Sequence, residues 1–287
     1  MAPATPSSTP FGPPDLMTTP ERQGSIEQLW FPGRAPELTT LFENQYRYHR
    51  GLISRYGTHR WITSDPSAPR FDAGTFQLGR YQVPVELLPP PTAALFVPLT
   101  MAVVDAPTSL SALQEACEVL ARIDGLDETV GQLVRAVHLL EAPPSHDVSH
   151  SSPELPFSIF VSVPGPGDKN RTLRLAESIL HESMHLQLTL IDRFDPIISE
   201  RPSSEYSPWK KEIRPVSGLL HGLYVFAVIF QVLDSIQNSK PMWSPYCRQR
   251  RITIAEEVAT LPDTPGGLSR SGTDLWQQCR RAVLGAS

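Results

Sequence analysis

One short stretch of the sequence has residue types and spacing that suit metal binding. Residues 180–188 contain His-Glu-x-x-His, which places His181 and His185 four residues apart. Side chains at this spacing are neighbours on an α-helix, so both imidazoles can reach one ion at about 2.0–2.2 Å. Glu182 lies about 100° around the helix from His181, the offset that sets a carboxylate beside the metal-bound water of zinc peptidases. The alternative is a helix whose two histidines face solvent or pack in the core.

Two acidic residues near the same helix face could support the histidines. Glu177 precedes His181 by four residues, and Asp192 follows His185 by seven. Metal-bound imidazoles usually donate their second N–H to a carboxylate or a carbonyl, so either acid is a candidate acceptor. The alternative for both is an ordinary solvated charge on a helix.

A metal site needs a third protein ligand. The zinc-protease signature that continues with Gly-x-x-His is absent, because residues 186–191 read Leu-Gln-Leu-Thr-Leu-Ile. Other zinc peptidases take a glutamate from a later helix. The glutamates available here lie in or near a Pro-rich stretch with no clear helical pattern: Glu200, Glu205 and Glu212.

His221 is the favoured third ligand. It lies in the apolar run 216–233, where a histidine needs a polar partner. Gly218 and Gly222 flank it and lower the helix propensity, which indicates a close approach by another backbone or by a ligand. The alternative is a core histidine that is hydrogen-bonded to the backbone.

Three histidines leave positions open on the metal. With Zn(II) the site would hold an activated water, and with Fe(II) it would be similar to the facial triad of oxygenases. An oxygenase that uses 2-oxoglutarate needs a cation for the far carboxylate, and Arg binds carboxylates bidentately. Arg214, seven residues before His221, is the candidate, with Lys210 as the second choice. The alternative for Arg214 is a surface cation.

Composition limits the other function classes. The chain has 287 residues, of which 40% are hydrophobic, so it can bury a core. Its formal net charge of -5 and the absence of a Lys/Arg run predict no nucleic-acid partner. Three widely spaced cysteines are typical of a reducing compartment, so we expect a cytoplasmic protein. The run 216–233 approaches the length of a membrane span, but polar residues interrupt it, so we expect a buried helix and no membrane partner.

The elements that must position these residues are expected to be mainly α with a small β element. Residues 1–24 are rich in Pro, Ser and Thr and are expected to be a disordered tail, which leaves 25–287 as a single metal-dependent domain. Helical patterns cover 25–56, two helices within 109–140, 171–194, 216–237, 252–261 and 273–283. The strand candidate is 156–164, and the expected loops are 57–91, 143–152 and 195–214.

The segment 205–229, EYSPWKKEIRPVSGLLHGLYVFAVI, resembles the second signature of the HExxH-motif domain family. In that family Tyr-x-Pro-Trp and a basic residue precede Arg-Pro-x-x-Gly-x-x-His-Gly-x-Tyr, and the His-Glu-x-x-His helix comes first. Tyr206, Trp209 and Tyr224 occupy the aromatic positions. Such domains occur in gene clusters for ribosomally made, modified peptides, and several are described as iron- and 2-oxoglutarate-dependent peptide β-hydroxylases. The resemblance spans about 147–237.

The resemblance implies Fe(II) bound by His181, His185 and His221, 2-oxoglutarate as co-substrate and a precursor peptide as substrate. By extension it implies that Arg214 binds the co-substrate. Lys210 stands where the family commonly has Arg.

Two rival functions remain open. A zinc metallopeptidase would use Glu182 as general base, for example to trim a leader peptide. A non-catalytic module would keep a structural metal and only bind the peptide. In a hydroxylase, Glu182 would instead orient water or a ligand, or help to bind peptide. We expect the three imidazoles to converge on one point, and a glutamate from 200–212 in the site would favour the peptidase.

Overall fold

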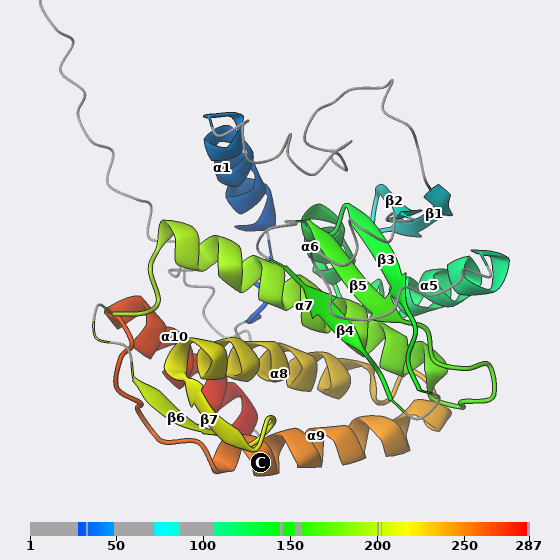
Figure 1. Ribbon diagram of the computed structural model, residues 1–287. Coiled ribbons are helices and arrows are strands. Elements are labelled where there is room, and N and C mark those ends of the chain that lie inside the picture. Colours follow the sequence, from blue (N-terminus) through cyan, green and yellow to red (C-terminus); the bar gives the residue numbers. More distant parts are fainter. Residues whose placement is uncertain are drawn as a thin grey trace, which may run out of the picture.

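The computed structural model describes residues 28–32, 34–48, 72–86, 106–143, 146–152, 157–199, 201 and 203–285. Within these ranges helices predominate, accompanied by a five-stranded mixed sheet and a two-stranded sheet (Figure 1). This agrees with the expected class, mainly α with a small β element. The tail expected at 1–24 lies outside the described residues.

The helices of the described part are α1 (Arg34–Tyr48), α5 (Ala106–Leu120), α6 (Leu126–Leu133), α7 (Arg171–Phe194), α8 (Val216–Ile236), α9 (Ser244–Ala259) and α10 (Arg270–Leu284), with a short 3-10 helix at Pro241–Trp243. The strands are β1 (Asp72–Leu78), β2 (Tyr81–Glu86), β3 (Ala136–Leu140), β4 (Ser149–Ser151), β5 (Ser158–Ser162), β6 (Ser204–Ser207) and β7 (Glu212–Pro215).

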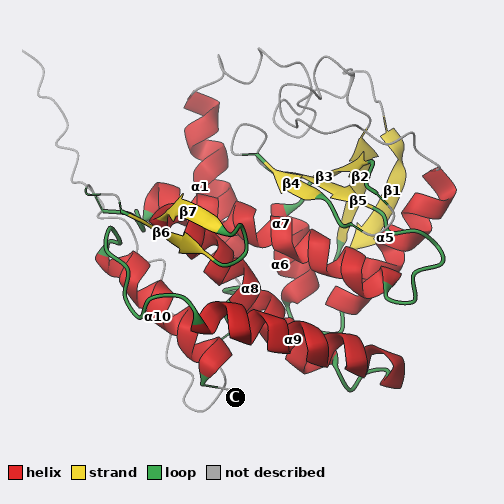
Figure 2. Cartoon of the chain, turned by 60° about the horizontal axis from the view of Figure 1, so that its bottom comes forward, coloured by secondary structure: helices red, strands yellow, loops and turns green. Residues whose placement is uncertain are grey.

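The larger sheet has the strand order β1-β2-β3-β5-β4. Its centre is parallel, because β3 pairs with both β2 and β5 in that sense, whereas β1 and β4 are antiparallel to their neighbours. One face packs against α5, α6 and α7, with Val137 and Ile159 in the main core (Figure 2). Side chains alternate along a strand, so His138 and Phe160 occupy the other face.

The hairpin β1–β2 corrects the expectation of a loop over 57–91. Its apolar residues alternate with polar ones, and Phe76, Leu78, Val83 and Val85 are buried against the core. The connecting turn contains Gly79 at φ 56°, a backbone conformation that glycine adopts without strain. The Pro-rich surroundings and Pro84 within β2 obscured this period-two pattern.

Strand β3 corrects the second helix expected within 109–140. Helices α5 and α6 are present, but the chain leaves α6 at Leu133 and continues as the central strand. Every residue of β3 is buried, His138 included, so its sequence has no alternation of apolar and polar residues that separates a strand from a helix. The expected loop at 143–152 likewise contains β4, whereas the strand predicted at 156–164 is confirmed as β5.

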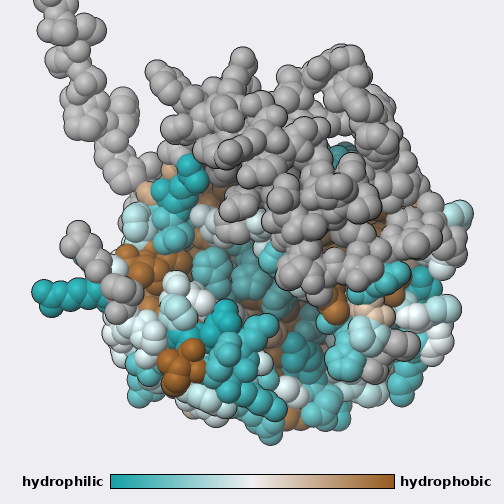
Figure 3. All heavy atoms as spheres, in the orientation of Figure 1, coloured by the Kyte–Doolittle hydropathy of each residue, from teal (hydrophilic) through white to brown (hydrophobic). Residues whose placement is uncertain are grey.

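The β6–β7 hairpin corrects the loop expected over 195–214. Its four-residue turn, 208–211, ends at Lys211 with φ 56°, and the Lys211 N–H donates to the carbonyl of Ser207 at 2.7 Å. Figure 3 shows a small hydrophobic patch among hydrophilic atoms where this hairpin lies in Figure 1, and Ile213 on β7 is 67% exposed.

Helices α7 and α8 cross in the core and have the bounds that the sequence predicted to within one residue. Helix α8 is long and apolar enough to cross a membrane by length and composition, and 67% of its most apolar window is buried inside the fold. It packs against α7, α9 and α10. Helices α9 and α10 both begin earlier in the chain than expected.

Candidate functional site

Helix α7 presents the two motif histidines side by side. Their Nε2 atoms are 3.2 Å apart and their ring centroids 4.8 Å apart. Two nitrogens that each lie 2.0–2.1 Å from one ion are separated by roughly 3.0–3.4 Å. His181 and His185 therefore fit as neighbouring ligands of a single ion. Leu180, Met184 and Leu188 are buried on the same helix and hold it against the core.

His221 joins these two histidines because α8 packs across α7. Its ring lies nearly parallel to that of His185, at an interplanar angle of 18° and a centroid distance of 5.5 Å. The closest nitrogens are Nδ1 of His221 and Nδ1 of His185, at 3.3 Å. The three imidazoles are thus contiguous, but their nitrogens do not converge on one point as the sequence predicted. His185 stands between the other two and offers a different ring nitrogen to each.

The histidine cluster, defined as His181, His185 and His221, fits a metal through one pair of nitrogens. Among the described residues, no group of three or more His, Cys, Asp or Glu side chains has the arrangement of a metal site. The two ring nitrogens of an imidazole direct their lone pairs away from each other. For His221 to share an ion with the pair, its ring or that of His185 must turn about χ2.

Burial keeps the histidine cluster neutral. It lowers the pKa of His181 to about 4, and the charges of Arg250 and Lys210 act in the same direction. Burial also holds the pKa of His185 well below its usual range and lowers that of His221, against an opposing effect of Asp192. Neutral imidazole is the form that binds metal ions, so the cluster is ready to act as a set of ligands at neutral pH.

Glu182 is the buried acid of the site. It is 3% exposed, its Oε1 lies 4.0 Å from Nε2 of His181, and the Ser149 hydroxyl donates to that same oxygen at 2.6 Å. Burial raises the pKa of Glu182, while hydrogen bonds from Ser149 and Ser151 and the charge of Lys210 lower it. The carboxyl group therefore stands beside the ion position of the histidine pair.

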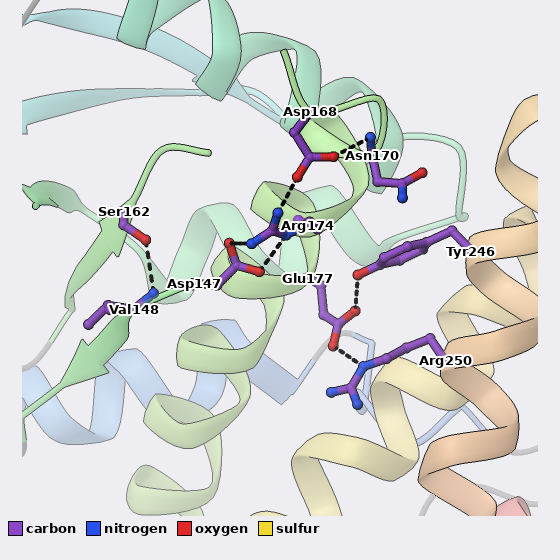
Figure 4. Close-up of polar contacts among 9 residues, drawn as sticks. All are labelled: Asp147, Val148, Ser162, Asp168, Asn170, Arg174, Glu177, Tyr246 and Arg250. Carbon is purple, nitrogen blue, oxygen red and sulfur yellow. Dashed lines mark hydrogen bonds and ion pairs between the residues drawn. The ribbon is translucent and has the colours of Figure 1, made fainter. Parts of the chain in front are cut away.

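Strand β4 supplies both serines, and two contacts position it, one with β5 and one with α7. Just before the strand, the Val148 N–H donates to Ser162 Oγ at 2.9 Å. Asp147 accepts two hydrogen bonds from Arg174 of α7, each 2.8 Å long, and Arg174 also contacts Asp168 (Figure 4). Sequence reasoning missed these serines, since residues 143–152 were expected to form a loop.

The two predicted cations have different positions. Lys210, in the β6–β7 turn, is exposed, and its charge lowers the pKa values of His181, Glu182 and His185. Arg214 has a side chain that is 44% exposed and donates to Glu212 at 2.8 Å. The structure thus brings Lys210 to the cluster and leaves Arg214 in a surface ion pair.

The glycines around His221 have separate explanations. A Cβ at Gly222 would lie 2.8 Å from the indole of Trp209, so glycine permits the close approach of that ring. A Cβ at Gly218 would have only Arg214 Nε near it, at 4.0 Å. Trp209 packs on Phe226 with ring centroids 5.2 Å apart, and Phe226 meets the ring of His181 at 5.5 Å. An aromatic wall, Trp209 and Phe226, therefore leads from the hairpin to the histidine cluster.

The acids expected to support the histidines have other partners. Glu177 accepts from the Tyr246 hydroxyl at 2.8 Å and from Arg250 Nε at 2.7 Å (Figure 4). Asp192 accepts from the backbone N–H of Ile197 at 2.9 Å. No hydrogen bond from a histidine to either acid occurs within the described ranges. Sequence reasoning missed Arg250, because it lies on α9 outside any motif.

The chain matches no protein-family model, and it has no significant match among curated proteins. The candidate site therefore stands on the geometry of this chain.

Proposed function

We propose that the protein is an Fe(II)- and 2-oxoglutarate-dependent hydroxylase that acts on side-chain β-carbons of a ribosomally made precursor peptide. The observation that carries this proposal is the pair of Nε2 atoms, 3.2 Å apart, with a third imidazole packed against His185. His181, His185 and His221 would hold the iron. Bound iron would supply the oxidising chemistry, in which O₂, 2-oxoglutarate and a C–H bond give succinate, CO₂ and a hydroxyl group.

The remaining residues support this proposal through binding and exclusion of water. Lys210 and Arg214 are the cations proposed to attract the co-substrate, and Lys210 already acts on the cluster electrostatically. The aromatic wall shields one side of His181 from solvent. Glu182, held by Ser149, would orient a water molecule or the peptide beside the ion.

A zinc metallopeptidase is the second candidate, and one observation favours it. Glu182 Oε1 lies 4.0 Å from His181 Nε2, which suits a general base beside a metal-bound water. The glutamate ligand that many zinc peptidases use has less support. Glu212 pairs with Arg214 on the exposed hairpin, and Glu200 lies outside the described residues.

Anaerobic purification followed by metal analysis and a turnover assay tests the proposal. We expect iron-dependent conversion of 2-oxoglutarate to succinate, stimulated by the peptide encoded beside this gene, and an oxygen atom added to that peptide by mass spectrometry. His185→Ala should abolish both iron binding and turnover. Bound zinc, peptide cleavage that Glu182→Gln eliminates and no succinate would establish the peptidase instead. A bound metal with neither reaction would leave a peptide-binding module.

A further inference from the structure

Arg250 places a second cationic group near the histidine cluster. It lies on α9, and its Cζ is 5.2 Å from the centroid of Phe226, whose ring meets that of His181. Its partner Glu177 precedes His181 by four residues, or about 6 Å along the axis of α7. The guanidinium group is therefore about one helical turn from the histidine pair, on the same side of α7.

Two contacts fix the orientation of this guanidinium group. Glu177 accepts from Arg250 Nε at 2.7 Å and from the Tyr246 hydroxyl at 2.8 Å, so both carboxylate oxygens are engaged (Figure 4). The Cζ atom of Arg250 also lies over the ring of Phe226. A cation held in this way loses little side-chain freedom when it binds a ligand.

The outer edge of the Arg250 guanidinium group, formed by Nη1 and Nη2, is available to bind a ligand. Figure 4 shows its terminal nitrogens pointing away from Tyr246 and Asn170. Within the described part of the chain, Nη1 and Nη2 have no hydrogen-bond partner, and neither is among the fully buried unpartnered polar atoms. The two parallel N–H groups of such an edge match the two oxygens of a carboxylate.

Arg250 is better placed than Arg214 for a carboxylate near the metal. The Arg250 side chain is 27% exposed, compared with 44% for Arg214, and its charge lowers the pKa of His181. Arg214 uses Nη1 for an exposed ion pair with Glu212, which solvent screens. The chain of a five-carbon 2-oxo diacid spans a distance comparable to one helical turn of about 5.4 Å.

We propose that Arg250 binds the far carboxylate of a five-carbon 2-oxo dicarboxylate whose other end lies at the histidine pair. Glu177 and Tyr246 act as positioning residues that hold the guanidinium group. This inference rests on the proposed function, and it assigns to Arg250 the role that the sequence suggested for Arg214.

Binding measurements on the intact iron-loaded protein under anaerobic conditions test the proposal without relying on turnover. Calorimetry compares 2-oxoglutarate with 2-oxopentanoate, which has the same chain but lacks the far carboxylate. We expect the wild type to prefer 2-oxoglutarate by roughly 10- to 100-fold, the range for hydrogen bonds between charged groups. Arg250→Met should reduce that preference to about one-fold while leaving 2-oxopentanoate binding unchanged.

Further variants separate recognition from folding. Arg250→Lys keeps the positive charge and the pairing with Glu177 but loses the two parallel N–H groups of the guanidinium edge. This variant should therefore remain folded and lose most of the preference for 2-oxoglutarate. Arg248→Met, on the exposed face of the same helix, removes an equal charge and should keep the full preference. Thermal unfolding verifies that each variant is folded before binding is measured.

The outcomes distinguish this inference from the proposed function. If the iron-loaded wild type binds neither 2-oxo acid, the proposed function fails and this inference fails with it. If the wild type prefers 2-oxoglutarate and both Arg250→Met and Arg250→Lys keep that full preference, only the assignment of Arg250 fails. If Arg214→Met loses the preference for 2-oxoglutarate and Arg250→Lys keeps it, Arg214 is the residue that binds the far carboxylate.

Discussion

Replacing Gly222 with alanine tests the contact that joins the β6–β7 hairpin to α8. A Cβ at this position would lie 2.8 Å from Cζ3 and 2.9 Å from Cε3 of Trp209. Both are atoms of a rigid ring, so the whole indole must move. Overpacking of this kind costs about 1–3 kcal/mol, while alanine gains up to about 1 kcal/mol in helix propensity. We expect Gly222→Ala to lower the free energy of unfolding by about 1 kcal/mol.

Gly218→Ala is the matched control, one turn earlier in the same helix. Gly218 is exposed, and the nearest atom to a Cβ at this position would be Arg214 Nε, at an ordinary 4.0 Å. Only the propensity gain applies here, so this variant should be more stable than wild type by up to about 1 kcal/mol. The difference between the two variants isolates the cost of displacing Trp209.

Urea denaturation, monitored by circular dichroism, gives the free energy of unfolding of each variant. Tryptophan fluorescence reports the environment of the indole. The second change Trp209→Leu should relieve most of the penalty in Gly222→Ala, because the two positions are in contact. If Gly222→Ala proves as stable as Gly218→Ala and its tryptophan fluorescence is unaltered, the Trp209 indole does not pack on α8. The description of Trp209 and Phe226 as an aromatic wall beside His181 would then be refuted.

Two further predictions concern buried polar groups away from the histidine cluster. Tyr224→Phe should cost about 1–3 kcal/mol in urea denaturation, because Gln187 Oε1 would lose a buried donor that lies at 2.6 Å; an unchanged midpoint would contradict this. Burial lowers the pKa of His138 from 6.5 to about 4, so the folded protein binds fewer protons than the unfolded chain in that range. The free energy of unfolding should therefore fall as pH drops from about 6.5 toward 4, and His138 should account for at most roughly 3 kcal/mol of the loss. His138→Asn should show a correspondingly shallower acid slope in denaturation series, and an identical slope would refute the role of His138.

The parts of the fold that were predictable from sequence depend on local patterns. Helix α7 combines a long helical period with a motif whose spacing itself sets two side chains side by side, so its bounds and the histidine pair followed directly. Strand β3 has no such pattern. All of its residues are buried, and it becomes a strand because it pairs with β5, which follows β4 in the chain.

The candidate site divides in the same way. His221 could be predicted from the sequence because a histidine inside an apolar helix needs a polar partner. In the structure that partner is His185. Arg250 and Ser149 carry no local signal, since each reaches α7 through tertiary packing of a distant element. The acids Glu177 and Asp192 had the right spacing for the histidine face, yet nearer donors on α9 and in the backbone engage them.

The two catalytic candidates make different demands on the Glu182 carboxyl group. A peptidase base must be ionised and must reach a mobile water, because it accepts a proton in each turnover. Here burial raises the pKa of Glu182, hydrogen bonds from Ser149 and Ser151 lower it, and Ser149 donates to the oxygen that lies nearest His181. A carboxyl group held in this way is better suited to orienting a neighbour than to cycling a proton. This arrangement supports the proposal of a bound dicarboxylate, whose far carboxylate would lie at Arg250, about one turn away.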